Sequence, residues 1–258
     1  CAGVMALIGM LNVAELATAM PRAGGDYFFI TRTLGPAVGT IGGVLTWFSL
    51  SLKTAFALVG MGAFIRLMLG EYLPDLSFPW IVLTLALVFT AFGIASERGL
   101  WRLQIVIVFV VLSLMGLYIG LGLPAMRLEN FAPFAPKGFS GVLFATGFVF
   151  VSYGGLLKVS SVAGEVRDPG RVIPLGMMLA LLVATMSYTL MVLVTDGVLR
   201  AEQLDNSLTP ISDGAAVFMG PPGVRLMGCA AMLAFMSTAN AGIHTASRYL
   251  VALSHDGL

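Results

Sequence analysis

Seven long apolar stretches, separated by short segments that hold most of the charged residues, constrain the fold of this chain more than any other feature. We place them at about 3–20, 36–69, 79–96, 101–123, 140–163, 172–195 and 222–250. A helix needs roughly 17 or more apolar residues to cross the hydrocarbon of a bilayer, and each stretch reaches that length. Only 10% of the 258 residues are charged, whereas about 25% is usual in soluble domains. The sequence therefore predicts an all-α, polytopic transmembrane helix bundle of about seven spans, forming one domain over residues 1–258.

The fifth stretch, 140–163, is interrupted near its middle by Ser152-Tyr153-Gly154-Gly155. Each glycine weakens a helix interior by roughly 1 kcal/mol relative to alanine. A break within lipid is tolerated only where protein or a watery cavity satisfies the freed N–H and C=O groups. Such groups can bind a ligand near the bilayer midplane. We therefore predict one discontinuous helix, with these four residues binding a substrate and Tyr153 closing over it. The alternative is a glycine pair that only lets another helix approach.

Three separated motifs resemble the amino acid–polyamine–organocation permease family. The first is AELATAMPRAGGDY at 14–27, the second is the broken segment followed by GEVRDP at 164–169, and the third is STANAG at 237–242 followed by ASR at 246–248. They follow the order and spacing of that family and together cover essentially the whole chain. The resemblance implies a partial leucine-transporter fold in which the seven stretches are the family's helices two to eight. The family's first helix, which is unwound, and its last helices are missing, so we expect a fragment of a permease.

The resemblance also implies how a substrate binds. In that family it lies between the two broken helices, the first and the sixth. N–H groups after Gly155, at a helix end carrying roughly half a positive charge, would then face an α-carboxylate. Carbonyl groups near Val151 would face the ammonium group.

Lys53 lies near the centre of the second stretch, where a charged side chain costs at least about 2.5–3.5 kcal/mol. It therefore needs a partner or a watery cavity, or it must lose its charge. We expect it to line the cavity and to couple transport to a proton; the alternative is a structural ion pair. Glu15 is the only acidic residue deep in a stretch, but its expected depth differs. The neighbouring Thr54 is a candidate substrate contact, unless its hydroxyl only bonds its own helix.

A polar cluster of Ser237, Thr238 and Asn240 lies in the last apolar stretch. In the wider fold, hydroxyl groups at this place hold sodium or replace it, so the cluster is a candidate cation-like site. Interhelical hydrogen bonding is the alternative and is slightly favoured. The lone His244, one turn further on, is expected to be a packing residue.

Charged residues near the expected cytoplasmic ends are candidates for a gate or for loop anchoring. They are Glu15, Arg22, Glu165 and Arg167. The mixed aromatic and charged segment 22–35 predicts either a short helix at the cytoplasmic face or a plain connector. The polar segment 199–221 predicts an external loop or a short helix. Lysine and arginine favour the loops after the first, third, fifth and seventh stretches, which would place the C-terminal end in the cytoplasm.

Composition and motifs exclude several classes of function. The net charge of +1 gives no field for nucleic acid. The two cysteines, Cys1 and Cys229, are too few for a disulfide framework or a metal site. Because we find no carboxylate pair, catalytic triad or phosphate loop, we expect no enzyme, no cofactor and no metal.

The sequence thus predicts a protein of the cell membrane that carries out secondary active transport of an amino acid or related amine by alternating access. We expect it to be driven by a proton. Its partners would be a small-molecule substrate, the proton and the lipid bilayer. The alternative is a seven-helix receptor or a structural membrane subunit, for which a broken helix is not required.

Overall fold

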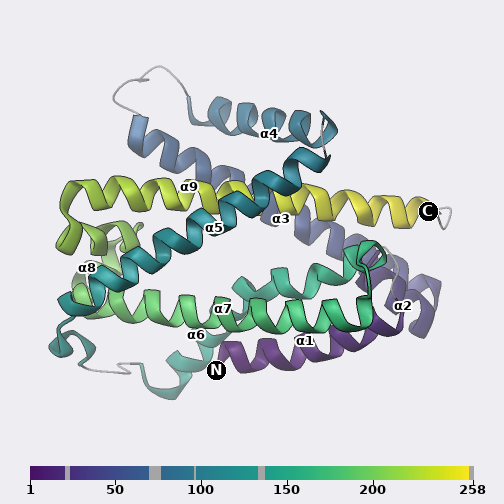
Figure 1. Ribbon diagram of the computed structural model, residues 1–258, viewed down its shortest axis with the longest axis horizontal. Helices are drawn as coiled ribbons and strands as arrows, with labels where there is room; N and C mark the ends of the chain where they lie inside the picture. The colour runs from purple at the N-terminus through teal and green to yellow at the C-terminus, as the bar shows by residue number, and fades with distance from the viewer. Residues whose placement is uncertain (21–23, 70–76, 96, 133–136, 256–258) are drawn as a thin grey trace. The chain divides into compact units, whose positions relative to one another are not determined.

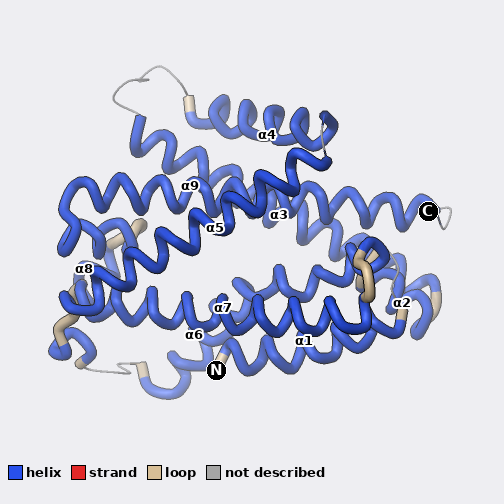
Figure 2. The backbone as a smooth tube through the Cα atoms, viewed as in Figure 1, coloured by secondary structure: helices blue, strands red, loops and turns tan. Residues whose placement is uncertain are grey.

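The structure is a computed structural model that describes residues 1–20, 24–69, 77–95, 97–132 and 137–255. Its described part contains helices and no strand (Figures 1 and 2). The helices are α1 Ala2–Ala19, α2 Asp26–Leu34, α3 Pro36–Leu69, α4 Phe78–Ala95, α5 Glu97–Gly122, α6 Gly138–Ser152, α7 Pro169–Val198, α8 Ala201–Asn206 and α9 Pro210–His255. Three 3-10 helices are η1 Leu123–Ala125, η2 Leu128–Phe131 and η3 Tyr153–Glu165. The predicted all-α fold is confirmed.

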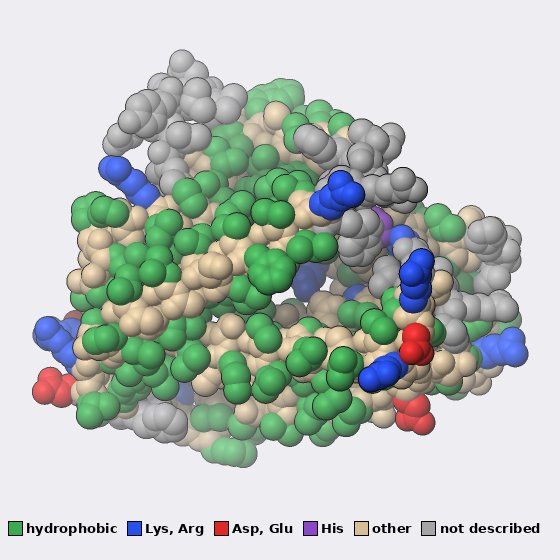
Figure 3. Space-filling view, viewed as in Figure 1, with side chains coloured by type: hydrophobic (Ala, Val, Ile, Leu, Met, Phe, Trp, Pro, Cys, Tyr) green, Lys and Arg blue, Asp and Glu red, His purple; other side chains and the backbone are tan. Residues whose placement is uncertain are grey.

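Six helical segments of the described chain are long and apolar enough to cross a membrane. A further apolar helix, Phe78–Ala91, corresponds to the third predicted span and is shorter. Large apolar side chains on these helices are widely exposed, and Figure 3 shows hydrophobic side chains spread among backbone and other atoms of the surface. Phe56, Phe144 and Phe148, for example, are 76%, 72% and 68% exposed. Apolar exposure on this scale suits lipid and not water, so the polytopic character of the bundle is supported by its surface.

The segment that precedes α3 contains a short helix, α2. Of the two alternatives for residues 22–35, the structure thus has the short helix and not the plain connector. Gly25 precedes α2 with φ of 50°, a conformation that side-chain-bearing residues rarely adopt. Asp26 then occupies the first turn, where the helix dipole favours a negative charge. Gly35, with φ of 90°, ends α2, and Pro36 begins α3 at the position that tolerates its missing N–H. Two glycines and one proline thus set the bounds of this helix.

The chain divides into two compact units. The first comprises Cys1–Ser51, Pro133–Met186 and His244–Leu258. One face of α1 is buried along its whole length at helical spacing, through Ala2, Ala6, Met10, Ala14 and Ala17. Because four of these five side chains are alanines, η3 and α6 can approach α1 closely, and both contact it. The core continues into α7 through Ile173, Met177 and Leu181.

The second unit comprises Leu52–Ala132 and Ser187–Ile243. One core cluster centres on Tyr118, whose hydroxyl lies 2.9 Å from Thr195 Oγ1. The Thr195 hydroxyl donates in turn to the Met191 carbonyl at 2.7 Å, so Tyr118 acts as the donor to Thr195. A second cluster packs α3, α4 and α9 together around Met61, Phe89 and Ala239.

The segment predicted as an external loop or short helix contains α8 and the beginning of α9. Gly220 interrupts α9 with φ of 65° and ψ of −160°, and two prolines follow it. Helical geometry resumes with Pro221, where the missing N–H groups of two successive prolines are least costly. The last long helix therefore starts within one residue of the predicted 222.

Candidate functional site: the α6–η3 junction

The predicted discontinuity lies at the expected motif, but its form differs from the expectation. The α6 helix ends at Ser152 and a 3-10 helix of 13 residues begins directly at Tyr153. The Tyr153 N–H donates to the Phe150 carbonyl, three residues back. We expected a new half-helix with free N–H groups after Gly155. The change of helix type keeps successive N–H groups bonded to the carbonyl three residues earlier, which lipid demands of a backbone that finds no partners elsewhere.

The glycine pair is explained by neither packing nor backbone strain. A Cβ atom added to Gly154 or Gly155 would meet nothing within 4 Å among the described residues. Neither residue has a positive φ. The alternative interpretation, close approach of another helix, is therefore not supported in this structure. What the pair does is leave the peptide backbone uncovered, and Gly155 is exposed. Each exposed carbonyl keeps a second lone pair that can accept a hydrogen bond from a ligand.

The two residues before the glycines lie in different surroundings. Ser152 is exposed, at the end of α6. Tyr153 is only 5% exposed and belongs to the core around α1. Its hydroxyl lies 3.6 Å from the position that a Cβ on Gly3 would take. To close over a substrate, the ring would have to leave this packing, and the gating role of Tyr153 stays a prediction.

The second predicted group lies on α3. Lys53 is exposed, whereas the adjacent Thr54 is 8% exposed. Thr54 packs against Gly242 of α9 so closely that a Cβ on this glycine would clash with the Thr54 hydroxyl. In this structure Thr54 therefore serves helix packing, and its contact with a substrate stays a prediction, as does proton coupling by Lys53.

The polar cluster on α9 includes a residue that sequence reasoning missed. Gln104 of α5 donates from Nε2 to Ser237 Oγ, and Gln104 Oε1 accepts from Asn240 Nδ2 at 3.2 Å. Thr238 turns away and donates to the Ala234 carbonyl of its own helix at 2.9 Å. The cluster thus forms a neutral hydrogen-bonded bridge between two helices. A glutamine in the largely apolar stretch 101–123 was the signal that could have drawn attention to Gln104.

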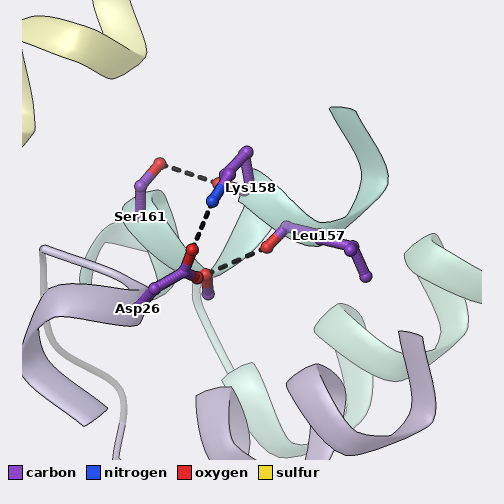
Figure 4. Close-up of polar contacts among 5 residues, drawn as sticks. Asp26, Leu157, Lys158 and Ser161 are labelled. Atoms are coloured by element: carbon purple, nitrogen blue, oxygen red, sulfur yellow. Dashed lines mark hydrogen bonds and ion pairs between the residues drawn. The ribbon is translucent and has the colours of Figure 1, made fainter. Parts of the chain in front are cut away.

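A second group that sequence reasoning missed joins η3 to α2. Lys158 Nζ forms an ion pair with Asp26 Oδ2 (Figure 4). The two side chains are 24% and 25% exposed. The Lys158 ammonium also lies 5.9 Å from the centroid of the Tyr249 ring, a distance at which a cation is attracted to a ring face. A lysine within a predicted membrane span was the available signal.

Close backbone packing surrounds this ion pair. A Cβ on Gly25 would lie 2.9 Å from Tyr249 Oη, 3.1 Å from Ser160 Oγ and 3.2 Å from the Ser161 nitrogen. Both serines are fully buried, and their hydroxyls donate back along η3 to the carbonyls of Leu157 and Lys158. Figure 4 shows these bonds beside the ion pair. The hydroxyl groups of both serines are thus satisfied within η3 itself, and glycine is required where α2 begins.

The predicted gate residues are only partly described. Glu15 is exposed on α1, where its carbonyl accepts a hydrogen bond from the Thr18 hydroxyl at 2.9 Å. Arg167 is exposed between η3 and α7. Arg22 and the side chain of Glu165 lie outside the described residues. Nothing in the geometry brings Glu15 and Arg167 into one site, and their role in a gate stays a prediction.

The described side chains offer no metal site. No group of three or more His, Cys, Asp or Glu residues in the described part of the chain could hold a metal ion. The chemistry that this part can perform at the α6–η3 junction is hydrogen bonding by backbone groups and the Ser152 hydroxyl.

Known proteins that are similar to this chain include several transporters. The chain is 25% identical to the branched-chain amino acid permease BcaP of Bacillus subtilis, covering 100% of this chain and 59% of that protein. It is 24% identical to the methylthioribose transporter of Bacillus subtilis, with the same two coverages. It is 27% identical to the vacuolar cationic amino acid transporter 2 of Arabidopsis thaliana, covering 43% of that protein. The chain spans about three fifths or less of the length of these relatives.

A family match covers the complete chain. The sequence profile of the family described as amino acid permease matches residues 1–258. The resemblance first seen in three motifs is thereby confirmed. With its long apolar helices and its exposed apolar surface, this integral membrane protein belongs to the amino acid permease family of the amino acid–polyamine–organocation superfamily, whose members are transporters and not enzymes.

Proposed function

We propose that this chain forms part of a secondary active transporter that binds an amino acid or a related organic compound at the α6–η3 junction. The observation that carries the proposal is the glycine pair Gly154-Gly155. It uncovers the backbone although neither neighbouring side chains nor a positive φ require glycine there. The names of the relatives, which cover branched-chain and cationic amino acids and methylthioribose, support this range of substrates.

The junction suits the ammonium end of an amino acid best. Carbonyl groups at the end of α6 and beside Gly155 can accept hydrogen bonds through their second lone pairs. The Ser152 hydroxyl is exposed beside them. The N–H groups of η3 are largely engaged within the 3-10 helix, so the substrate carboxylate requires donors beyond those that this form of the junction offers. We therefore assign recognition of the ammonium group to this segment.

Alternating access, coupling and orientation belong to the same proposal. Lys53, exposed on a membrane helix, is the residue we assign to proton coupling, since a charge within a membrane span is expensive and usually functional. Ser237 and Asn240 are hydrogen-bonded to a neutral amide, which supports bridging in preference to cation binding. We place the protein in the cell membrane, and the distribution of lysine and arginine supports a cytoplasmic C-terminal end.

Uptake by the purified protein in liposomes tests the proposal. A panel of labelled branched-chain, cationic and neutral amino acids and methylthioribose would be offered with and without an imposed pH gradient. We expect saturable uptake of at least one compound, which Gly155→Val reduces at least tenfold because its side chain covers the carbonyl groups. Gly176→Val is the matched control, because Gly176 of α7 is also exposed and has nothing within 4 Å of a Cβ.

Two outcomes of this experiment count against the proposal. One is the absence of uptake for every compound although the protein is folded in the liposomes. The other is an equal loss of uptake in the Gly155 and Gly176 variants, which would mean that the glycine pair serves only local helix stability.

A further inference from the structure

The length of η3 is unusual and has a mechanical consequence. Runs of 3-10 helix longer than three or four residues are uncommon, and such a stretch inside a helix often marks a functional hinge. Here the run is 13 residues long. A 3-10 helix rises about 2.0 Å per residue and an α-helix about 1.5 Å, with 3.0 and 3.6 residues per turn. Conversion of η3 to α-helix would therefore shorten it by about 6 Å and rotate one end relative to the other by roughly two thirds of a turn.

Conversion of η3 to α-helix would move the side chain of Lys158. Lys158 follows Gly155 by one turn of 3-10 helix and is paired with Asp26 of α2. Gly25, which precedes α2, packs closely against η3, since a Cβ on Gly25 would lie 3.1 Å from Ser160 Oγ and 3.2 Å from the Ser161 nitrogen. In the 3-10 register of η3, the Lys158 ammonium reaches the Asp26 carboxylate. If η3 were an α-helix, the Lys158 side chain would leave the helix axis in another direction than it does in the 3-10 form.

We propose that Lys158 is a positioning residue whose ion pair with Asp26 holds η3 in its 3-10 form and so sets the direction of the backbone groups at Gly154-Gly155. Opening of the ion pair converts η3 to α-helix, which turns these groups and ends one binding state of the junction. Assignment of this switch to a transport cycle rests on the proposed function; the coupling of the ion pair to the form of η3 does not.

Distances between two spin labels test the coupling directly. Labels would be attached to cysteines replacing Val151 and Arg167, both exposed and flanking η3, in a protein with Cys1→Ser and Cys229→Ser. Without the ion pair, in Lys158→Gln, we expect a population whose label distance is shorter by about 6 Å. Asp26→Asn should give the same population. Lys158→Arg should keep the native distance, as should the exchanged pair Asp26→Lys with Lys158→Asp.

The control removes a lysine elsewhere in the same unit. Lys137 is exposed at the beginning of α6, and Lys137→Gln should leave the distance unchanged. If Lys158→Gln does not fold, Asp26→Asn supplies the same test from the opposite partner. A native distance distribution in a folded variant that lacks either charge overturns the proposal. So does a shift that Lys158→Arg reproduces, since bulk and not charge would then matter.

Transport kinetics separate this proposal from the preceding one. A positioning role predicts that Lys158→Gln raises KM several-fold with a smaller change in kcat, and that Lys158→Arg restores KM. The label distances need no substrate, so they remain decisive if no compound in the panel is transported. Conversely, uptake that depends on Gly155 combined with an unchanged distance would keep the proposed function and eliminate the switch.

Discussion

Gln104 is the residue whose role the hydrogen bonds define most narrowly. Its amide joins Ser237 and Asn240 of α9 to α5. Gln104→Leu keeps the size of the side chain but removes both bonds, each worth about 0.6 kcal/mol on average between membrane helices. We expect a loss of about 1 kcal/mol in the free energy of unfolding, measured by steric trapping in bicelles. Ser113→Ala is the control, because that hydroxyl is exposed and bonds only its own helix. A double-mutant cycle with Ser237→Ala that shows no coupling would contradict the bridge.

At this scale the sequence identified unusual residues but not their partners. Ser237 and Asn240 were recognised as a polar cluster, yet the residue that binds them is 133 and 136 positions away. Lys158 and Asp26 are separated by 132 positions. Periodicity within one helix carries no information about which helix lies opposite, so these pairs could not be predicted. Thr54 shows the same limit, because its burial against Gly242 depends on how α3 and α9 pack.

At the scale of the element, the conformation of the chain at the beginning of α2 depends on Gly25. Gly25→Ala meets two obstacles, a positive φ and contacts of 2.9 to 3.2 Å around the new Cβ. Gly35→Ala at the other end of α2 meets only the first, since nothing lies within 4 Å of its Cβ among the described residues. Backbone strain of this kind is worth roughly 1–3 kcal/mol. We expect both variants to lower the midpoint of thermal unfolding in detergent, Gly25→Ala clearly more. Equal shifts would mean that the contact with η3 adds nothing.

Helix positions were predictable because lipid imposes them. Apolar length placed the long helices, and Pro36 begins α3 at the first residue of the predicted stretch 36–69. The form of the break was not predictable. Gly154 and Gly155 weaken an α-helix, but the sequence does not state whether the chain then unwinds or changes to a 3-10 helix. We attribute that choice to the Asp26–Lys158 pair and to the small face of α1 against which η3 packs, both of which are features of the folded chain.

At the scale of the whole molecule, the family match extends over both compact units. Residues of both units also occur in single helices, since the ranges of α3, α7 and α9 each contain a boundary between units. The proposed coupling between solute and proton would involve the whole molecule, and one residue of α3 offers a test of it.

Lys53 is that residue. If its ammonium group releases a proton during transport, an imposed gradient that is acidic outside accelerates uptake by keeping Lys53 protonated on the outer side. Lys53→Ala removes the carrier of the charge, so we expect uptake at equal pH to continue while the acceleration by the gradient disappears. Lys137→Ala, which removes an exposed lysine at the beginning of α6, should retain the acceleration. The measurement is initial uptake in liposomes at a series of external pH values. Acceleration of the Lys53 variant to the same degree as the unaltered protein would assign the proton to another group.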